Sequence, residues 1–294
     1  MTSWRERWRG LVALGPALAL GTRDRVTVER LPPFTSSLLG EVRTVDVFVP
    51  RGYHADSSAS FPVVYMNDGQ DMAAVDLAST LDSLQQHGAM APALVVAIHA
   101  TERVQDYGTA GIPNAQGLGA RAAVYERFLL EELMPAIDAR YRTLRGPAAT
   151  AVMGWSLGGL SAFDLAWQHA DRIGAVGVFS GAFWWRTDDS SPAARQASRI
   201  MHRRIRETAG RPKLRMWFET GLQDETADRD GDGVIDAIQD TEELLAELSR
   251  KGYRRGPDMV HLTVEGRHDL PTWKRILPEF LAWVYPGQVA ASGR

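Results

Sequence analysis

The chain has 294 residues, of which 45% are hydrophobic and 23% charged, and its formal net charge is −3. This composition is typical of a folded globular domain and excludes a disordered, collagen-like or coiled-coil chain. The slight negative charge argues against a nucleic-acid partner. The absence of cysteine excludes disulfides, thiolate catalysis and zinc–thiolate sites.

The N-terminal segment 1–25 is treated apart from the rest of the chain. Three arginines between positions 5 and 9 precede the apolar run 11–20, an order that is typical of signal peptides. This run is short, and Gly15 and Pro16 interrupt it. We therefore expect an N-terminal arm on a cytoplasmic protein, with a signal-like segment and export as the alternative. No run of 18 apolar residues occurs, so no membrane partner is expected.

Strand and helix patterns alternate along the remainder of the chain. An alternating pattern predicts an antiparallel edge strand at 43–49. Short apolar runs predict buried parallel strands at 61–66, 93–99, 148–153, 173–179, 214–219 and 260–264. Helical patterns lie at 121–140, 157–169, 191–208, 240–251 and 272–284. We expect an α/β fold with a mostly parallel central sheet and helices on both faces, forming one domain at 26–287 before a C-terminal tail at 288–294.

A nucleophile elbow is predicted around Ser156. The segment Gly154-Trp155-Ser156-Leu157-Gly158 fits the pattern G-x-S-x-G, follows a predicted strand and opens a predicted helix. The two glycines allow a sharp turn and close helix packing, which holds the serine hydroxyl at the carboxyl edge of the sheet. A glycine-rich turn that contains a serine by chance is the alternative.

The base that a serine nucleophile needs is predicted to be His268. In α/β-hydrolases the chain order is serine, acid, histidine. His268 follows the predicted strand 260–264, so it lies at the sheet edge that carries Ser156. His202 stands in an arginine-rich helix and His261 within a strand, and both fit the role less well.

The acid of the triad should follow the predicted strand 214–219. Asp224 stands three residues past Gly221, where its carboxylate can reach back under the imidazole and orient it. Glu225 and Asp228 remain alternatives for this role.

Two main-chain amides are expected to form an oxyanion hole. One is the N–H of Leu157 at the start of the helix that follows the serine. The other is the N–H of Gln70, because Gly69 permits close backbone approach in the loop 67–72 after a central strand. An ordinary Asn-Asp-Gly turn is the alternative for this loop.

Aromatic residues near the elbow predict a substrate pocket. We assign Trp155, Trp184 and Tyr125 to it, together with Asp68 of the oxyanion loop. Aromatic walls favour aryl or sugar rings as ligands. Packing in the core is the alternative for each aromatic residue.

The segment 228–236 resembles a calcium-binding loop. Its acidic residues follow the spacing of an EF-hand loop, but Gln239 stands where a bidentate glutamate is expected. Bound calcium would be structural and would hold the loop that carries Asp224. A solvated acidic loop that caps the next helix is the alternative. The candidate ligands are Asp228, Asp230, Asp232, Val234, Asp236 and Asp240.

Five motifs are distinctive: DGQ (68–70), YERFLLEELMPAIDARYRT (125–143), GWSLGG (154–159), VFSGAFWW (178–185) and VEGRHDLPTWKRILPEFLAWVY (264–285). They resemble the esterase-D/enterochelin-esterase-like family, a broad group with bacterial feruloyl and acetyl-xylan esterases and S-formylglutathione hydrolases. The resemblance covers about residues 40–285 and implies an α/β-hydrolase fold without a large cap domain. It also implies metal-independent serine-esterase chemistry, with Ser156 as nucleophile, His268 as base and the DGQ loop as oxyanion loop.

The function expected from the sequence is hydrolysis of carboxylic esters with small or aromatic acyl groups, including esters on sugars. The partner is a small-molecule ester, no cofactor is required for the chemistry, and the protein is expected to be a monomer or homodimer. One alternative is an acyltransferase of mycolyltransferase type, in which an alcohol replaces water. Another is a catalytically inactive carbohydrate-binding module with the same fold.

Overall fold

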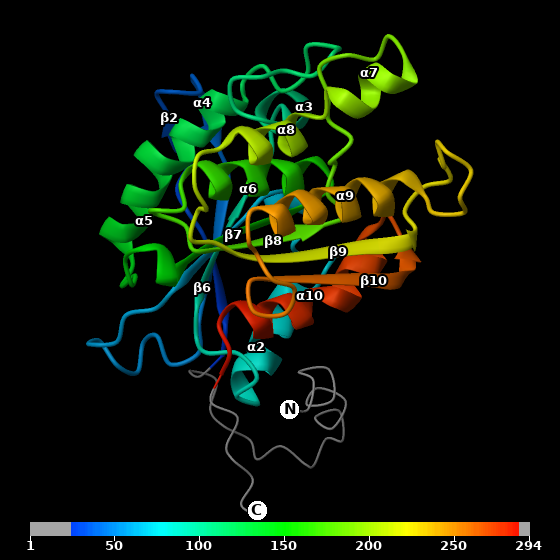
Figure 1. Cartoon of the computed structure of the whole chain (residues 1–294). Helices are drawn as coiled ribbons and strands as arrows, with labels where there is room; N and C mark the ends of the chain where they lie inside the picture. The colour runs from blue at the N-terminus through cyan, green and yellow to red at the C-terminus, as the bar shows by residue number, and fades with distance from the viewer. Residues whose placement is uncertain (1–24, 288–294) are drawn as a thin grey trace, which may run out of the picture.

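The structure, a computed structural model, describes residues 25–287 and is built on an eight-stranded sheet (Figure 1). Six neighbouring strands pair in parallel, from β6 to β10, whereas β4 pairs antiparallel with β1 and β6. The expected mostly parallel sheet is therefore confirmed. In spatial order the strands are β1 (Thr27–Arg30), β4 (Val45–Val49), β6 (Leu94–Ile98), β5 (Val63–Met66), β7 (Thr150–Trp155), β8 (Ala175–Phe179), β9 (Arg215–Gln223) and β10 (Met259–Arg267).

The two terminal segments distinguished in the sequence fall at the limits of this description. The arm 1–25 lies outside the described residues except for Arg25, and the tail 288–294 lies outside them entirely.

Strand β4 lies inside the sheet, so its predicted edge position is wrong. It stands between β1 and β6, and all five of its residues are buried. The polar residue in its alternating pattern, Asp46, accepts two hydrogen bonds from Arg30 and lies 2.9 Å from His99 Nε2. The bond from Arg30 holds the pKa of Asp46 below its ordinary value. The polar position in the alternating pattern at 43–49 is therefore a carboxylate paired inside the protein, and it does not mark a strand face exposed to solvent.

Helices cover both faces of the sheet, and each face has its own apolar core (Figure 1). Helices α2 and α10 pack on one face, whereas α4, α5, α6, α8 and α9 lie on the other. No helix within residues 25–287 is both long and apolar enough to cross a bilayer. The helices are α2 (Leu77–Gln86), α3 (Arg103–Asp106), α4 (Ala122–Arg127), α5 (Met134–Arg140), α6 (Leu157–Gln168), α7 (Pro192–Ala197), α8 (Ile200–Glu207), α9 (Asp236–Arg250) and α10 (Leu270–Val284).

Two of the predicted helices are interrupted. The segment 121–140 comprises α4 and α5 joined by a wider π-helical turn at Phe128–Leu133. The segment 191–208 is split into α7 and α8, because Arg199 takes an extended backbone and buries its guanidinium against Asp240. The elements that were not predicted are β1, α2, α3 and the hairpin of β2 (Phe34–Ser36) and β3 (Glu41–Arg43).

The tight contact between β8 and α10 gives a first prediction. A Cβ added at Gly177 would lie 2.5 to 2.9 Å from three atoms of the Phe280 ring. Overpacking of this kind costs about 1–3 kcal/mol of unfolding free energy. We expect this loss for Gly177→Ala in urea denaturation, and partial recovery when Phe280→Leu is added. Equal stability of Gly177→Ala and the wild type would contradict the packing.

Candidate active site

Ser156 lies at the sharp turn between β7 and α6. Its φ of 55° and ψ of −124° form a conformation that residues other than glycine rarely adopt. Its N–H donates to the carbonyl of Phe179 in β8, and its own carbonyl accepts from the N–H of Leu160. A Cβ at Gly154 would lie 2.4 Å from the Gly158 main chain, so the strand and helix touch here without side chains. The strand–turn–helix context expected of an elbow is present.

His268 stands directly after β10, at the carboxyl edge of the sheet. The residue is exposed, and its ring packs in a T-shaped contact with Trp273, with 5.2 Å between centroids. Burial lowers the pKa of the imidazole, and the charge of Asp224 acts in the opposite direction. A lowered pKa keeps the imidazole neutral at pH 7, which is the form that accepts a proton.

Asp224 is the acidic candidate that lies beside His268. Strands β9 and β10 pair as far as Gln223 and Arg267, across a register shift between Val264 and Arg267, so the residues that follow them are neighbours. Burial raises the pKa of the Asp224 carboxyl, while the Ser180 hydroxyl and the charge of His268 lower it. The carboxyl and the imidazole therefore interact electrostatically.

The other two acidic candidates lie in different surroundings. Glu225 is exposed, and the charged groups beside it include Asp236 and Asp240. Asp228 accepts hydrogen bonds from main-chain N–H groups of its own loop. Of the three candidates, only Asp224 has an electrostatic contact with His268 among the residues described.

The loop after β5 forms a short 3-10 turn, η1 (Gly69–Asp71), pressed against β6. A Cβ at Gly69 would lie 2.7 Å from the main chain of β6, so this close approach requires glycine. The side-chain amide of Gln70 donates to Asp68 and accepts from the N–H of Ala100, each at 3.1 Å. These contacts fix the backbone at Gln70, the residue expected to supply an oxyanion amide.

A buried ion pair anchors the same loop to the elbow. The Asp68 carboxylate is fully buried and accepts hydrogen bonds from Arg103 Nε and Nη2 at 2.8 and 2.9 Å. Arg103 Nη2 also donates to the carbonyl of Trp155, the residue before Ser156. The positive charge of Arg103 contributes to the lowered pKa of His268. Arg103 therefore connects the oxyanion loop, the elbow and the base.

Three of the four residues assigned to the substrate pocket are buried supports, which corrects that assignment. Trp155 and Tyr125 are 1% and 2% exposed, and Asp68 is fully buried. Trp155 belongs to the core under α10, where its ring stacks on Trp273 at 5.4 Å. Trp155 is therefore inaccessible to solvent although it directly precedes Ser156 in the sequence. Trp184 is 42% exposed and stays a pocket candidate.

Three residues that sequence analysis did not select surround the acid and the base. Trp273 in α10 contacts His268 and donates from Nε1 to Ser180 Oγ at 3.0 Å. Ser180 follows β8, and the buried Glu219 of β9 lies 3.4 Å from its hydroxyl. Burial raises the pKa of Glu219 to about 8, with a contribution from the charge of Asp224. The signal in the sequence that could have identified Glu219 is its position as a charged residue at the end of the predicted buried strand 214–219.

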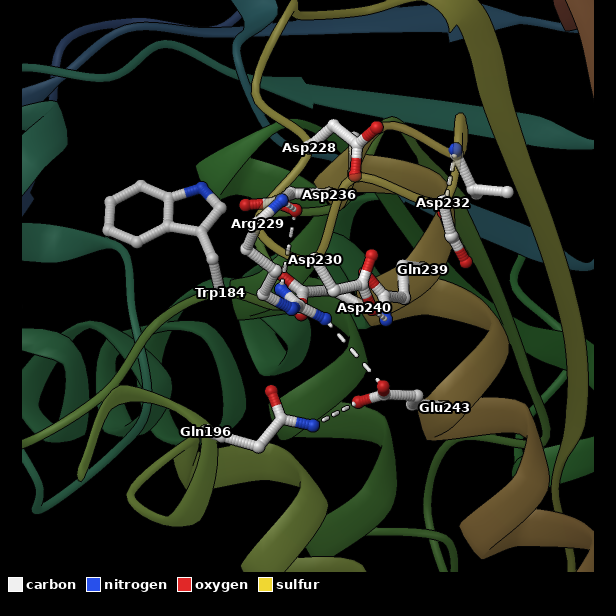
Figure 2. Close-up of polar contacts among 12 residues, drawn as sticks. Trp184, Gln196, Asp228, Arg229, Asp230, Asp232, Asp236, Gln239, Asp240 and Glu243 are labelled. Carbon is white, nitrogen blue, oxygen red and sulfur yellow. Dashed lines mark hydrogen bonds and ion pairs between the residues drawn. The ribbon is translucent and has the colours of Figure 1, made fainter. Parts of the chain in front are cut away.

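The aspartate loop between β9 and α9 gathers part of the candidate calcium ligands (Figure 2). One carboxylate oxygen from each of Asp228, Asp230 and Asp232 lies within 4.8 Å of the others. Asp228 accepts two main-chain N–H groups of the loop, and Asp232 accepts the N–H of Val234. The three carboxylates therefore lie close together, and calcium binding by them stays a prediction.

The remaining acidic ligands are engaged by arginine. The main-chain N–H of Arg229 donates to Asp236, and its guanidinium bonds to Asp240 at 2.7 Å (Figure 2). Asp240 is also paired with Arg199 and is 2% exposed. The assignment of Asp240 as a ligand is therefore corrected, because its carboxylate is buried and Oδ1 is bonded to two guanidinium groups.

Comparison with known proteins gives one family match and several structural neighbours. A model of the family described as "Putative esterase" matches residues 36–284. An uncharacterized protein of Bacillus subtilis, YbbA, is 21% identical over 227 residues, which are 76% of this chain and 84% of YbbA.

Two solved structures share the architecture. The enterobactin esterase FES from Shigella flexneri, in the presence of enterobactin, has a TM-score of 0.69 at 23% identity. This match covers 88% of the present chain and 58% of the enterobactin esterase, so the present chain spans little more than half of that protein. A ferulic acid esterase has a TM-score of 0.66 at 18% identity over 90% of this chain and 98% of its own. These matches confirm the expected α/β-hydrolase fold.

The aspartate loop gives a prediction about calcium. With a dissociation constant of about 10⁻⁴ M, 10 mM Ca²⁺ would stabilise the folded protein by about 2.7 kcal/mol. We expect a rise in Tm of roughly 5 °C in calorimetry, absent with the same concentration of Mg²⁺ and absent in Asp230→Asn. Asp188→Asn, an exposed carboxylate outside the loop, is the matched control. An unchanged Tm with Ca²⁺ would identify a solvated acidic loop.

Proposed function

The chain belongs to the putative-esterase family, and from this premise we propose that it is a serine carboxylic-ester hydrolase with a Ser156–His268–Asp224 triad. The observation that carries the proposal is the juxtaposition of a strained serine elbow with a histidine–aspartate pair at the same sheet edge. The order of the three residues along the chain is also that of α/β-hydrolases.

The first half of the reaction forms an acyl-enzyme. His268, neutral at pH 7, takes the proton of the Ser156 hydroxyl as its oxygen attacks the ester carbonyl carbon. The carbonyl oxygen gains the negative charge of the tetrahedral intermediate. When this intermediate collapses, the imidazolium donates its proton to the leaving alcohol. Asp224 orients the ring and stabilises the imidazolium while that charge exists.

The second half returns the enzyme to its starting state. Water attacks the acyl-enzyme carbonyl, and His268 accepts a proton from that water. Collapse of the second tetrahedral intermediate releases the carboxylic acid, and His268 returns the proton to Ser156. In a transferase an alcohol would take the place of water in this step.

The oxyanion is assigned to the main-chain N–H groups of Leu157 and Gln70. Leu157 is the first residue of α6, so its N–H has no acceptor within the helix and lies at the positive end of the helix dipole. Gln70 is held by the contacts of its side chain with Asp68 and Ala100. Removal of one donor of this kind typically costs about 10²–10³ in kcat.

The proposed substrates are small or aromatic esters, including esters carried by sugars. Support comes from exposed apolar side chains in segments at the carboxyl ends of β6, β8 and β9, the edge that carries Ser156. They are Val104, Trp184 and Leu222, each more than 40% exposed. The name of one structural neighbour, a ferulic acid esterase, points to the same acyl class.

Replacement of the nucleophile tests the proposal directly. Wild-type protein should react with a fluorophosphonate probe and hydrolyse p-nitrophenyl acetate and methyl ferulate. Ser156→Ala should lose labelling and at least about 10³-fold in kcat. Ser83→Ala, on the exposed side of α2, is the matched control and should match the wild type. Equal turnover by Ser156→Ala would exclude Ser156 as the nucleophile, and an absence of labelling and turnover in both proteins would favour the binding module.

Replacement of the acidic candidates identifies the third member of the triad. Asp224→Asn should lower kcat by about 10²–10⁴, because the imidazolium loses its counter-charge and the neutral ring is no longer held in the productive tautomer. Glu225→Gln and Asp228→Asn should stay within about threefold of the wild type, since such surface changes are worth only a few tenths of a kcal/mol. A large loss in either of these variants, with a small one in Asp224→Asn, would reassign the acid.

A further inference from the structure

Glu219 is a buried carboxyl group for which the proposed reaction has no use. It lies within β9 and is 1% exposed, and its Oε1 atom has no hydrogen-bond partner among residues 25–287. Buried carboxylates are rare unless they are paired with a cation. Burial and the charge of Asp224 raise the pKa of Glu219 to about 8, against smaller opposing effects of Ser180 and Arg275. Glu219 therefore holds a proton at neutral pH.

Ser180 lies between Glu219 and the acid of the triad. Its main-chain N–H donates to the Glu219 carbonyl at 2.8 Å, which fixes the hydroxyl beside both carboxyl groups. Its Oγ accepts a hydrogen bond from Trp273 Nε1, a group that can only donate. The single Ser180 proton can then point to Asp224 or to Glu219, but not to both. Directing it to Asp224 requires Glu219 to donate to Ser180.

Asp224 needs the hydrogen bond from the Ser180 hydroxyl because its carboxylate is tightly enclosed and has few other hydrogen-bond donors. Both of its oxygens are buried without a hydrogen bond of standard geometry to any described residue. A Cβ at Gly221 would lie 2.5 Å from Asp224 Oδ1 and 2.7 Å from the Gly266 carbonyl, so no further side chain fits against it. The Ser180 hydroxyl is the side-chain donor that lowers the pKa of Asp224.

We propose that Glu219 is a positioning residue for the triad and acts as a neutral carboxylic acid. Its O–H donates to Ser180 Oγ, the Ser180 O–H is thereby directed to Asp224, and one negative charge lies beneath His268. This inference rests on the proposed triad. Loss of the Glu219 proton to solvent leaves two carboxylates that compete for one hydroxyl and repel each other. Asp224 is then displaced from His268, and catalysis slows.

The charged groups packed around this cluster do not neutralise a second carboxylate. Arg275 of α10 is the cation that acts on Glu219, and its guanidinium also donates to the carbonyl of Glu265. Asp269, which caps α10, adds another negative charge near Asp224. The charge of Arg103 acts on His268, but Arg103 is paired with Asp68. Ionisation of Glu219 is therefore not compensated locally.

The test is the pH dependence of kcat and KM between pH 5.5 and 10, with p-nitrophenyl acetate as substrate. Wild-type kcat should fall above about pH 8 with a single ionisation, as Glu219 loses its proton. Glu219→Gln keeps a neutral donor, so its kcat at pH 7 should lie within about threefold of the wild type, since the hydrogen bond is retained. Its alkaline decrease should disappear. Glu219→Ala should lose about 3- to 10-fold in kcat with unchanged KM, because the neutral hydrogen bond that directs the Ser180 hydroxyl to Asp224 is lost.

A purely structural role for Glu219 would give a different result. Glu219→Gln would then show the wild-type alkaline decrease, and Glu219→Ala would change kcat by the same factor at every pH. Either result overturns the proposal. Glu265→Gln, an exposed glutamate on the neighbouring strand β10, is the matched control and should keep the wild-type profile.

Thermal stability tests the protonation of Glu219 without reference to activity. Unfolded Glu219 loses its proton near its ordinary value of 4.5, whereas the folded group keeps it up to about pH 8. The stability of the wild type should therefore fall between these values, and this contribution should be absent in Glu219→Gln. The Tm of Glu219→Gln should rise relative to the wild type from pH 5 to pH 8. A constant difference would show that Glu219 is ionised in the folded protein.

The two measurements also separate this inference from the proposed function. If wild-type protein neither labels with the fluorophosphonate nor hydrolyses the ester, the hydrolase proposal fails, and with it the role of Glu219 in positioning a triad. If labelling and hydrolysis are normal but Glu219→Gln keeps the alkaline decrease, only the role of Glu219 fails.

Discussion

The site depends on the contact between β7 and α6 at which the chain reverses around Ser156. The backbone of Ser156 has a positive φ, and such strain persists only where the surroundings fix it. Here Gly154 and Gly158 remove all side-chain bulk from the contact, and Phe179 holds the Ser156 N–H from the next strand. The first turn of α6 is thereby aimed at the same point as the hydroxyl. The proposed nucleophile and the proposed oxyanion donor are therefore positioned by one steric constraint.

A second level of organisation is electrostatic and joins segments that are distant in the chain. Arg103 pairs with Asp68, bonds to the carbonyl of Trp155 and contributes to the lowered pKa of His268. The same cation thus fixes the loop that carries Gln70 and favours the neutral form of His268. Trp273 contacts the imidazole and bonds to Ser180. The proposed base thus interacts with a charged group and with an aromatic ring.

The sequence predicted those features that follow from local pattern. Parallel strands were recognisable as apolar runs, and His268 was assigned because it follows the last of them. Burial could not be predicted in the same way. Trp155 adjoins the serine but faces the core, and the polar Asp46 suggested an edge strand although it is paired inside the sheet. The break at Arg199 depends on Asp240, which lies 41 residues away. Glu219 was treated as a strand residue because its partners come from β8 and α10.

The aspartate loop has an architectural consequence beyond ion binding. A main-chain hydrogen bond of 2.8 Å from the N–H of Asp236 to the carbonyl of Ala227 joins the two ends of the loop. The chain therefore leaves β9 and enters α9 at nearly the same point, whatever path it takes between them. The entropy of closing such a loop changes only slowly with its length. The segment 230–235 is thus a modular insertion, which evolution or an engineer could shorten, lengthen or exchange while Arg229 keeps its bonds to α9, and β9 and α9 keep their places.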